Sequence, residues 1–250
     1  MKKLALLAPA CGVLATLLPG STAAEPSSSS RLTVFAAASL TGVFPKINRY
    51  PRYSFAGSDQ LAFQIQQGAP ADVYAAASPK YPEQLYKQGL VQRPIAFATN
   101  SLIVLLPKSN PGNIHSVFDL TKPGVKVVVA EPSVPVGSYT LTVLKNLGIT
   151  NGVMKNVVSE ESDVKGVVAK VVLGEADAGF VYKTDARPVR RKVETIGLRA
   201  SAQPRVVYEV AVVKSSKHLR AAYRYVTQLV RPRGQNILAA NGFGRRPKTG

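Results

Sequence analysis

The chain has 250 residues, of which 46% are hydrophobic and 18% are charged, and its formal net charge is +18. This composition is typical of a folded globular protein and excludes a largely disordered chain. The length suffices for one large domain or for two small ones.

The N-terminal residues have the pattern of a secretory signal peptide. Lys2 and Lys3 precede an apolar run over residues 4–18, and small residues at 21–24 offer a cleavage site. The run is too short and too interrupted by proline and glycine to be a membrane span. We therefore predict a signal peptide over residues 1–24 and an exported, periplasmic or extracytoplasmic protein.

The segment after the leader and the single cysteine limit the chemistry further. Residues 25–30 contain one proline and four serines and predict a flexible, solvated tether. Cys11 lies inside the leader, and its sequence context does not favour lipid anchoring. Without Cys11 the mature chain has no cysteine, which excludes disulfides and thiol chemistry.

Basic side chains concentrate in the last third of the chain. From Lys183 to the C-terminus there are 16 Lys and Arg against Asp185, Glu194 and Glu209. Such a region indicates nucleic acid, a polyanionic surface or simple solubility. No nucleic-acid motif accompanies it, and an exported protein seldom meets nucleic acid. We interpret it as a solvated surface that attracts anions weakly, and we expect no nucleic-acid partner.

The first predicted element is a buried strand over residues 34–38 that stops at Ser39. A helix is predicted after it from apolar residues at i, i+3, i+4 and i+7, namely Leu40, Val43, Phe44 and Ile47, although Pro45 is expected to kink or shorten it. Ser39 can cap this helix, and the free N–H groups of a first helical turn form an anion site. A role for Ser39 as a cap alone stays open at this point.

The same arrangement recurs about twenty residues later. Tyr53 and Phe55 alternate as in a strand, Ser58 follows, and Leu61 and Ile65 share one face of a predicted helix. Two strand–hydroxyl–helix junctions in succession are less easily explained by capping alone than one.

Strands and helices alternate through the rest of the chain, which predicts an α/β fold with mostly parallel sheets. Ligands in such folds bind beyond the carboxyl ends of the strands. Further strands are predicted over residues 69–77, 101–106, 125–130, 176–181, 193–196 and 206–213, and further helices over 79–87, 138–147, 164–172, 219–229 and 234–240.

The sequence offers little support for an enzyme. His115 and His218 do not stand in a metal-ligand spacing, and there is no Ser-His-Asp order, phosphate-binding glycine loop or catalytic carboxylate pair. The acidic residues 160–163 precede a helix, where acids ordinarily complement the helix dipole. We expect no catalytic activity and no cofactor.

Several segments together resemble the substrate-binding proteins of molybdate/tungstate ABC transporters. They cover essentially the whole mature chain in order: VFAAASL (34–40), FAGSDQLAFQI (55–65), GAPADV (68–73), EPSVPVG (131–137), ESDV (161–164), GFVYKTDA (179–186) and the strand at 208–213. The first segment, combined with VPVG and VYKTDA, is fairly specific to this family.

The resemblance implies a type II periplasmic-binding-protein fold with two α/β lobes, a ligand cleft between them and two crossover strands. It places lobe 1 at residues 31–107 and 211–250 and lobe 2 at 108–210. It also implies a monomer that captures molybdate or tungstate and delivers it to the membrane permease of an ABC importer.

Carried over residue by residue, the resemblance assigns the tetrahedral oxyanion to five residues. Ser39 and Ser58 would each offer a hydroxyl and a backbone N–H, Val136 and Val164 a backbone N–H, and Tyr182 its hydroxyl. No free metal cation is expected, because molybdenum or tungsten would enter only as the oxyanion. Neutral donors at helix starts suffice to hold such a dianion.

Some alternatives stay open. Asp59 stands beside the predicted site and would repel a dianion unless it points away, whereas it could accept the proton of a bound phosphate. Sulfate has the charge of molybdate and differs in size, although Tyr182 favours the larger anions. A basic surface protein that binds polyanions is a further alternative.

Overall fold

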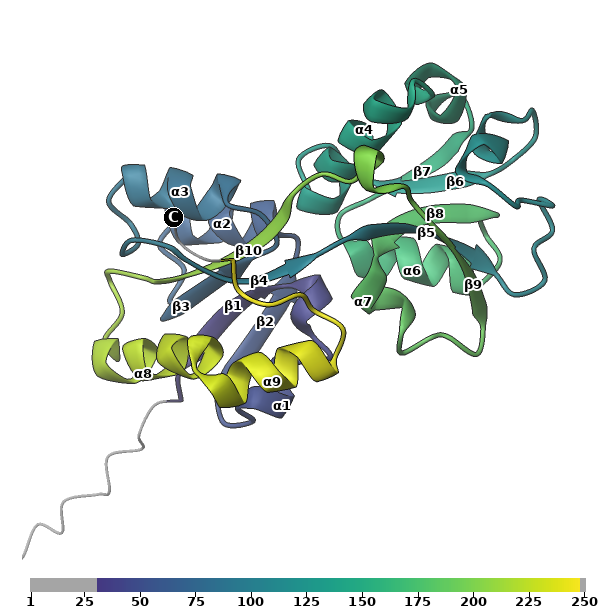
Figure 1. Ribbon diagram of the computed structural model, residues 1–250. Coiled ribbons are helices and arrows are strands. Elements are labelled where there is room, and N and C mark those ends of the chain that lie inside the picture. Colours follow the sequence, from purple (N-terminus) through teal and green to yellow (C-terminus); the bar gives the residue numbers. More distant parts are fainter. Residues whose placement is uncertain (1–30, 248–250) are drawn as a thin grey trace, which may run out of the picture. The chain divides into compact units, whose positions relative to one another are not determined.

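The computed structural model describes residues 31–247 (Figure 1). The predicted signal peptide (1–24), the tether (25–30) and Cys11 lie outside the described residues. Within residues 31–247, none of the helices combines the length and the apolar character needed to cross a membrane.

The first of two five-stranded sheets has the order β2-β1-β3-β10-β4. β1 is parallel to β2 and β3, whereas β10 is antiparallel to both β3 and β4. The strands are β1 (Thr33–Ala37), β2 (Arg52–Ala56), β3 (Val73–Ala76), β4 (Ile95–Asn100) and β10 (Val206–Val212).

The second sheet repeats this arrangement with the order β7-β6-β8-β5-β9. β6 is parallel to β7 and β8, and β5 is antiparallel to β8 and β9. Its strands are β5 (Leu102–Pro107), β6 (Val127–Ala130), β7 (Val157–Glu161), β8 (Ala178–Tyr182) and β9 (Val193–Gly197). The α/β prediction is confirmed. Each sheet is mixed, because one strand, β10 in the first sheet and β5 in the second, runs against the other four.

The chain passes between the sheets twice. β4 ends at Asn100 and β5 begins at Leu102, and the return runs from the end of β9 to the start of β10. β5 lies in the second sheet, although the predicted boundary at 107/108 assigned it to lobe 1. The first residues of β10 lie in the first sheet, although the predicted boundary at 210/211 assigned them to lobe 2. The division into two lobes as compact units stays a prediction.

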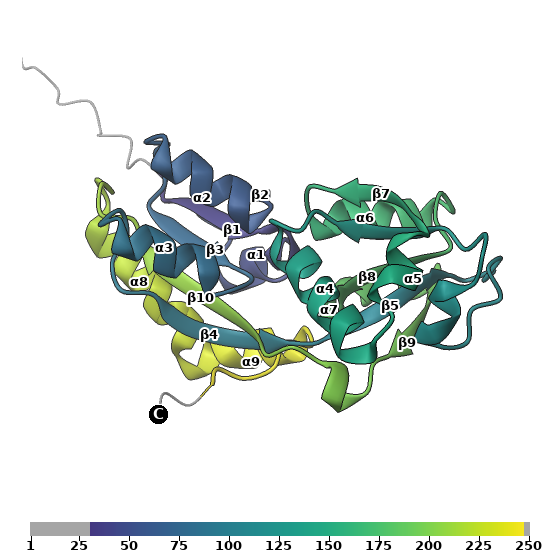
Figure 2. The ribbon, with the colours of Figure 1, turned by 90° about the horizontal axis from the view of Figure 1, so that it is seen from above.

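Helices cover both faces of each sheet (Figures 1 and 2). On the first sheet, α2 and α3 cover one face, and α1, α8 and α9 cover the other. Successive side chains of β1 point to opposite faces and so enter both cores. Phe35 packs with Leu61 and Leu85, whereas Val34 belongs to the core that contains Leu229. These helices are α1 (Phe44–Ile47), α2 (Ser58–Gln66), α3 (Lys80–Lys87), α8 (Leu219–Val230) and α9 (Pro232–Ala240).

On the second sheet, Gly179 of β8 lets α6 pack closely, because a Cβ there would lie 2.7 Å from a methyl group of Val167. The helix predicted over residues 138–147 ends at Leu147 as expected, and Gly148 follows it with a left-handed φ of 71° that suits glycine. The helices of this half are α4 (Pro135–Leu147), α5 (Thr150–Met154), α6 (Val164–Val172) and α7 (Lys183–Ala186), and the chain also has 3₁₀ turns η1 (Ala38–Leu40), η2 (Val117–Thr121) and η3 (Ala200–Ala202).

The helix predicted after Ser39 is shortened at Pro45, as expected. The chain forms the 3₁₀ turn η1 and then the short helix α1, which has Pro45 in its first turn. Proline has no N–H to donate and so cannot lie inside a longer helix without breaking a hydrogen bond. The apolar spacing still serves the core, since Leu40, Val43 and Phe44 are buried.

Candidate functional site

A small cavity lies where the starts of α2, α4 and α6 meet the end of β8. Its volume is about 10 Å³, measured as the room open to the centre of a water-sized atom, and it is lined by Ala37, Ala38, Ser39, Ala56, Gly57, Ser58, Ala77, Val134, Pro135, Val136, Asp163, Val164 and Tyr182. All five residues that the sequence singled out belong to this lining. Pockets for organic ligands usually measure about 300–1,000 Å³, so this cavity suits a small ion.

Ser39 belongs to η1, and its predicted capping role is wrong. The N-cap position is Ala37, and no side chain caps this turn. The Ser39 hydroxyl instead lies 2.9 Å from the hydroxyl of Tyr208. Asn100 Nδ2 donates to the same Tyr208 oxygen at 3.4 Å. Because Tyr208 accepts from Asn100, its own proton can go to Ser39 Oγ, which leaves the Ser39 proton free to donate into the cavity.

Ser58 is also no cap. Gly57 holds the N-cap position of α2, and Ser58 is the first helical residue. Its Oγ accepts the backbone N–H of Ala77 at 3.1 Å. A hydroxyl that accepts at this point keeps its proton for a second partner. Both serines are therefore buried hydroxyls with a proton available toward the cavity.

The three helices that begin at the cavity keep free backbone donors. No side chain caps α2 or α4. At α6 the Asp163 carboxylate accepts the N–H groups of Lys165 and Gly166, at 2.6 and 3.2 Å. Val136, in the first turn of α4, and Val164, the first residue of α6, thus have amides that no helical carbonyl can accept. The positive ends of three helix dipoles point to the same space.

Two glycines allow the backbone segments around the cavity to lie against one another. A Cβ on Gly137 would lie 2.1 Å from the carbonyl oxygen of Glu131. A Cβ on Gly57 would lie 2.6 Å from the carbonyl oxygen of Ser162. Any larger residue at these positions would push apart the loops that form the cavity.

Tyr182 ends β8 with its side chain 1% exposed and its hydroxyl without a hydrogen-bond partner among the described residues. A buried hydroxyl left unpaired costs about 1–3 kcal/mol. Burial raises the pKa of the Tyr182 phenol well above its ordinary value, and nearby Tyr208, Tyr139 and Asp185 add to the shift. The phenol is therefore a neutral donor that still lacks an acceptor.

Asp59 does not line the cavity. Its Oδ2 accepts the hydroxyl of Ser133 at 2.8 Å, whereas its other oxygen is buried without a partner. Ser133 also receives the hydroxyl of Tyr81 at its carbonyl oxygen. One oxygen of the Asp59 carboxylate is thus held by the loop between β6 and α4, while the other lies beside the backbone of Gly57.

The charged side chains near the cavity form an ion pair or accept hydrogen bonds from backbone amides. Behind Tyr182, the buried Asp185 carboxylate forms an ion pair with Lys165 at 2.6 Å. Burial raises the pKa of the Asp185 carboxyl, while Lys165 opposes the shift. Asp163 is the one charged residue in the lining, and its oxygen already accepts two amides. No group of His, Cys, Asp and Glu within residues 31–247 could hold a metal ion.

Sequence reasoning missed the residues that support the serine hydroxyls. Tyr208 contacts Ser39 across 169 positions of sequence, and Ala77 contacts Ser58 across 19. Asn100 reaches both Tyr208 and Thr184 from the junction of β4 and β5. Such partners have no local sequence signal, because only the folded sheet order brings them together.

Comparison with known proteins finds relatives over most of the chain. The family described as bacterial extracellular solute-binding protein matches residues 32–244. The molybdate-binding protein ModA of Mycobacterium tuberculosis H37Rv is 38% identical over 238 residues, which cover 91% of this chain and 90% of the relative.

Solved structures share the fold. The periplasmic molybdate-binding protein of Azotobacter vinelandii has a TM-score of 0.77 at 24% identity, over 87% of this chain and all of that one. The sulfate-binding protein SubI of Mycobacterium tuberculosis H37Rv has a TM-score of 0.73 at 20% identity, over 85% of this chain and 86% of that one. At these identities the two structures bear on the fold alone.

Proposed function

The chain belongs to the bacterial extracellular solute-binding protein family, and on that premise we propose that it captures molybdate or tungstate in the cavity at Tyr182. The bound oxyanion is delivered to the membrane permease of an ABC importer. The protein acts outside the cytoplasmic membrane as a monomer, without a cofactor and without catalysis.

The unpaired hydroxyl of Tyr182 is the observation that carries this proposal. A buried donor without an acceptor lies in the same small cavity as the uncapped starts of α2 and α4. An oxyanion supplies the missing acceptors at once. It receives the hydroxyls of Ser39, Ser58 and Tyr182 and the backbone N–H groups of Val136 and Val164, and each such bond is worth about 1.5–3 kcal/mol.

The choice of anion rests on the relatives and on the missing acceptors. The 38% identical relative carries the name of a molybdate-binding protein. A phosphate that retains a proton needs an acceptor in its site. Asp59 faces Ser133, and Asp163 already accepts two amides, so phosphate is disfavoured. Sulfate is the remaining alternative, because the fold is shared with a sulfate-binding protein.

A catalytic role finds no support in the lining. No histidine lines the cavity with the two serines, and the one carboxylate there, Asp163, already accepts two amides. His218 instead lies 3.1 Å from Asp72, outside the lining.

Calorimetry and thermal unfolding with molybdate, tungstate, sulfate and phosphate test the proposal. A ligand at a hundredfold excess over its Kd raises the free energy of unfolding by about 2.7 kcal/mol. We expect this shift for molybdate and tungstate, and a loss of the shift in the Ser39→Ala/Ser58→Ala variant. Ser138→Ala, an exposed serine of α4 outside the lining, is the matched control. No stabilisation by molybdate or tungstate at hundredfold excess over micromolar protein contradicts the assignment.

A further inference from the structure

One surface of the first-sheet half carries positive charge only. It is formed by residues 45–52, by the exposed side of α8 and by the first turn of α9, and it is called here the basic face. From Arg31 to Ser58 and from Val210 to Gly250, the sequence has no Asp or Glu, and its basic side chains are Lys and Arg together with His218. The three segments lie on the same side of the first sheet (Figure 1).

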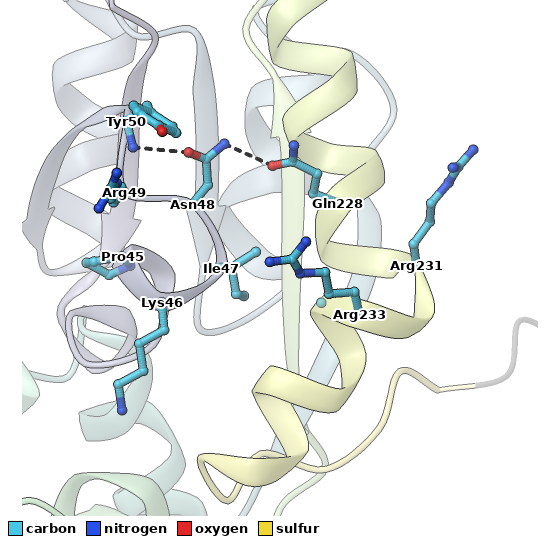
Figure 3. Close-up of a pocket in the computed structure, with 10 residues that line it drawn as sticks. Pro45, Lys46, Ile47, Asn48, Arg49, Tyr50, Gln228, Arg231 and Arg233 are labelled. Atoms are coloured by element: carbon cyan, nitrogen blue, oxygen red, sulfur yellow. Dashed lines mark hydrogen bonds between the residues drawn. The ribbon is translucent and has the colours of Figure 1, made fainter.

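Contacts join the parts of the basic face into one surface. Asn48 Nδ2 donates to Gln228 Oε1 at 3.0 Å, which links the segment before β2 to α8. The two segments line a recess, and Figure 3 shows the side chain of Arg233 reaching across it toward Ile47, whereas Arg231 extends outward from the start of α9. Gly234 allows α9 to begin against the end of α8, because a Cβ there would lie 2.0 Å from the carbonyl oxygen of Gln228.

The cations of this face have no acidic partners. The ion pairs in the described part of the chain involve Asp72, Asp119, Asp185 and Glu175, and no arginine takes part in any of them. The exposed arginines of the basic face are Arg49, Arg52, Arg220, Arg224, Arg231 and Arg233. Their charged groups therefore face solvent and are not neutralised by ion pairs within the described residues.

Two tyrosines stand exposed among these arginines. Tyr50 is 70% exposed and Tyr223 is 48% exposed. The guanidinium of Arg49 lies 5.3 Å from the centre of the Tyr50 ring. Tyrosine has an apolar ring and a polar tip and is enriched at membrane interfaces, and juxtaposed cations attract anionic lipid headgroups.

We propose that the basic face docks on an anionic phospholipid surface, with the arginines on the lipid phosphates and Tyr50 and Tyr223 at the headgroup level. Charge complementarity and the exposed tyrosines support this occupant. The matched family is described as extracellular, and outside the cell a lipid surface is a more accessible polyanion than nucleic acid. None of these residues lines the cavity at Tyr182, so the docking is independent of the captured anion. It would keep the protein close to a membrane-embedded transporter and so raise its local concentration there.

Vesicle sedimentation tests the docking. The full chain is mixed with vesicles of phosphatidylglycerol and phosphatidylcholine, or of phosphatidylcholine alone. We expect binding to the anionic vesicles only, with a steep decrease as salt rises. Each basic residue near such a surface increases the vesicle partition coefficient about fivefold. The variant Arg49→Gln/Arg224→Gln/Arg231→Gln/Arg233→Gln should lose about two orders of magnitude or more in partitioning.

A control variant separates this face from net charge. Lys155→Gln/Arg190→Gln/Arg191→Gln/Lys192→Gln removes the same charge from exposed positions of the second-sheet half. We expect it to retain most of the binding. Equal losses in the two variants would overturn the proposal, because total charge would then explain the attraction. Thermal unfolding with and without molybdate verifies that both variants are folded, and it reports the fate of the cavity separately.

Two further arms exclude other polyanions. Soluble glycerol phosphate should not displace the protein from vesicles, and displacement at millimolar concentration would replace the docking surface by a site for a single phosphate group. Duplex DNA at the same phosphate concentration should bind less tightly than the vesicles. Tighter binding to DNA would refute a membrane as the partner.

Discussion

Tyr182→Phe separates the ligand role of Tyr182 from a structural role, because the two roles predict opposite changes in stability. The substitution removes one oxygen that lacks a partner in the described residues and leaves the ring in its buried place. Removing an unpaired buried hydroxyl should stabilise the unliganded protein. The gain should be about 1 kcal/mol, the lower end of the cost of a buried hydroxyl without a partner.

Oxyanion affinity should change in the other direction. The lost bond from a neutral hydroxyl to an anion is worth about 1.5–3 kcal/mol, which corresponds to a 10- to 150-fold increase in Kd. Calorimetric titration with molybdate measures this change, and urea unfolding of the ligand-free protein measures the stability. Compared with the wild type, the Tyr182→Phe variant should therefore be more stable without ligand and less stable at saturating molybdate.

Tyr225→Phe is the matched control. Its hydroxyl is buried and paired with the hydroxyl of Tyr53 at 3.2 Å, so the variant should lose about 1 kcal/mol of stability and keep its affinity for molybdate. If Tyr182→Phe is destabilised like the control, its hydroxyl has a structural partner. If its Kd stays within a factor of two of the wild type, the hydroxyl does not contact the anion, and the reasoning fails.

Three other substitutions give distinct outcomes. Tyr208→Phe should raise the Kd for molybdate about fivefold by releasing the Ser39 hydroxyl, and it should add nothing in a chain that already carries Ser39→Ala; additive losses in the calorimetric double-mutant cycle would contradict the coupling. Gly137→Ala should cost about 2 kcal/mol or more in urea unfolding, since the new Cβ would meet a carbonyl oxygen at 2.1 Å, and an unchanged midpoint would show that the loop adapts. Burial raises the pKa of Glu209 to about 7, so the native state binds this proton more tightly than the unfolded state, and stability falls as the pH rises from about 4.5 to 7. Glu209→Gln should remove this part of the pH dependence and stabilise the protein more at pH 8 than at pH 5. An equal effect of the substitution at both pH values would contradict the shift.

Elements with a strong local signal were predictable from the sequence. The continuous apolar run at residues 101–106 corresponds closely to β5, which is buried throughout. The end of α4 at Gly148 was predictable because a left-handed residue there favours glycine. The motif order, read through its resemblance to a family, also selected five residues that the fold brings into one cavity.

Weaker local signals left gaps. β4 (Ile95–Asn100) and β7 (Val157–Glu161) were not predicted as strands. β7 lies at the edge of its sheet with a partly exposed, partly acidic sequence, so no buried face marks it. α5 (Thr150–Met154) has five residues, too few for a helical period to show. The mixed direction of both sheets depends on which strands pair across the two crossings, and no local pattern encodes that choice.

The error at Ser39 and Ser58 bears directly on the proposed function. A capping serine accepts an amide of the first helical turn and so consumes a donor. Here Gly57 and Ala37 hold the cap positions, and the serine oxygens pair with Tyr208 and with the amide of Ala77. The amides at the start of α2 therefore remain free, and both hydroxyl protons can also be donated. The corrected geometry provides more donors to an anion than the predicted one, because long-range partners replace the local ones that capping would have used.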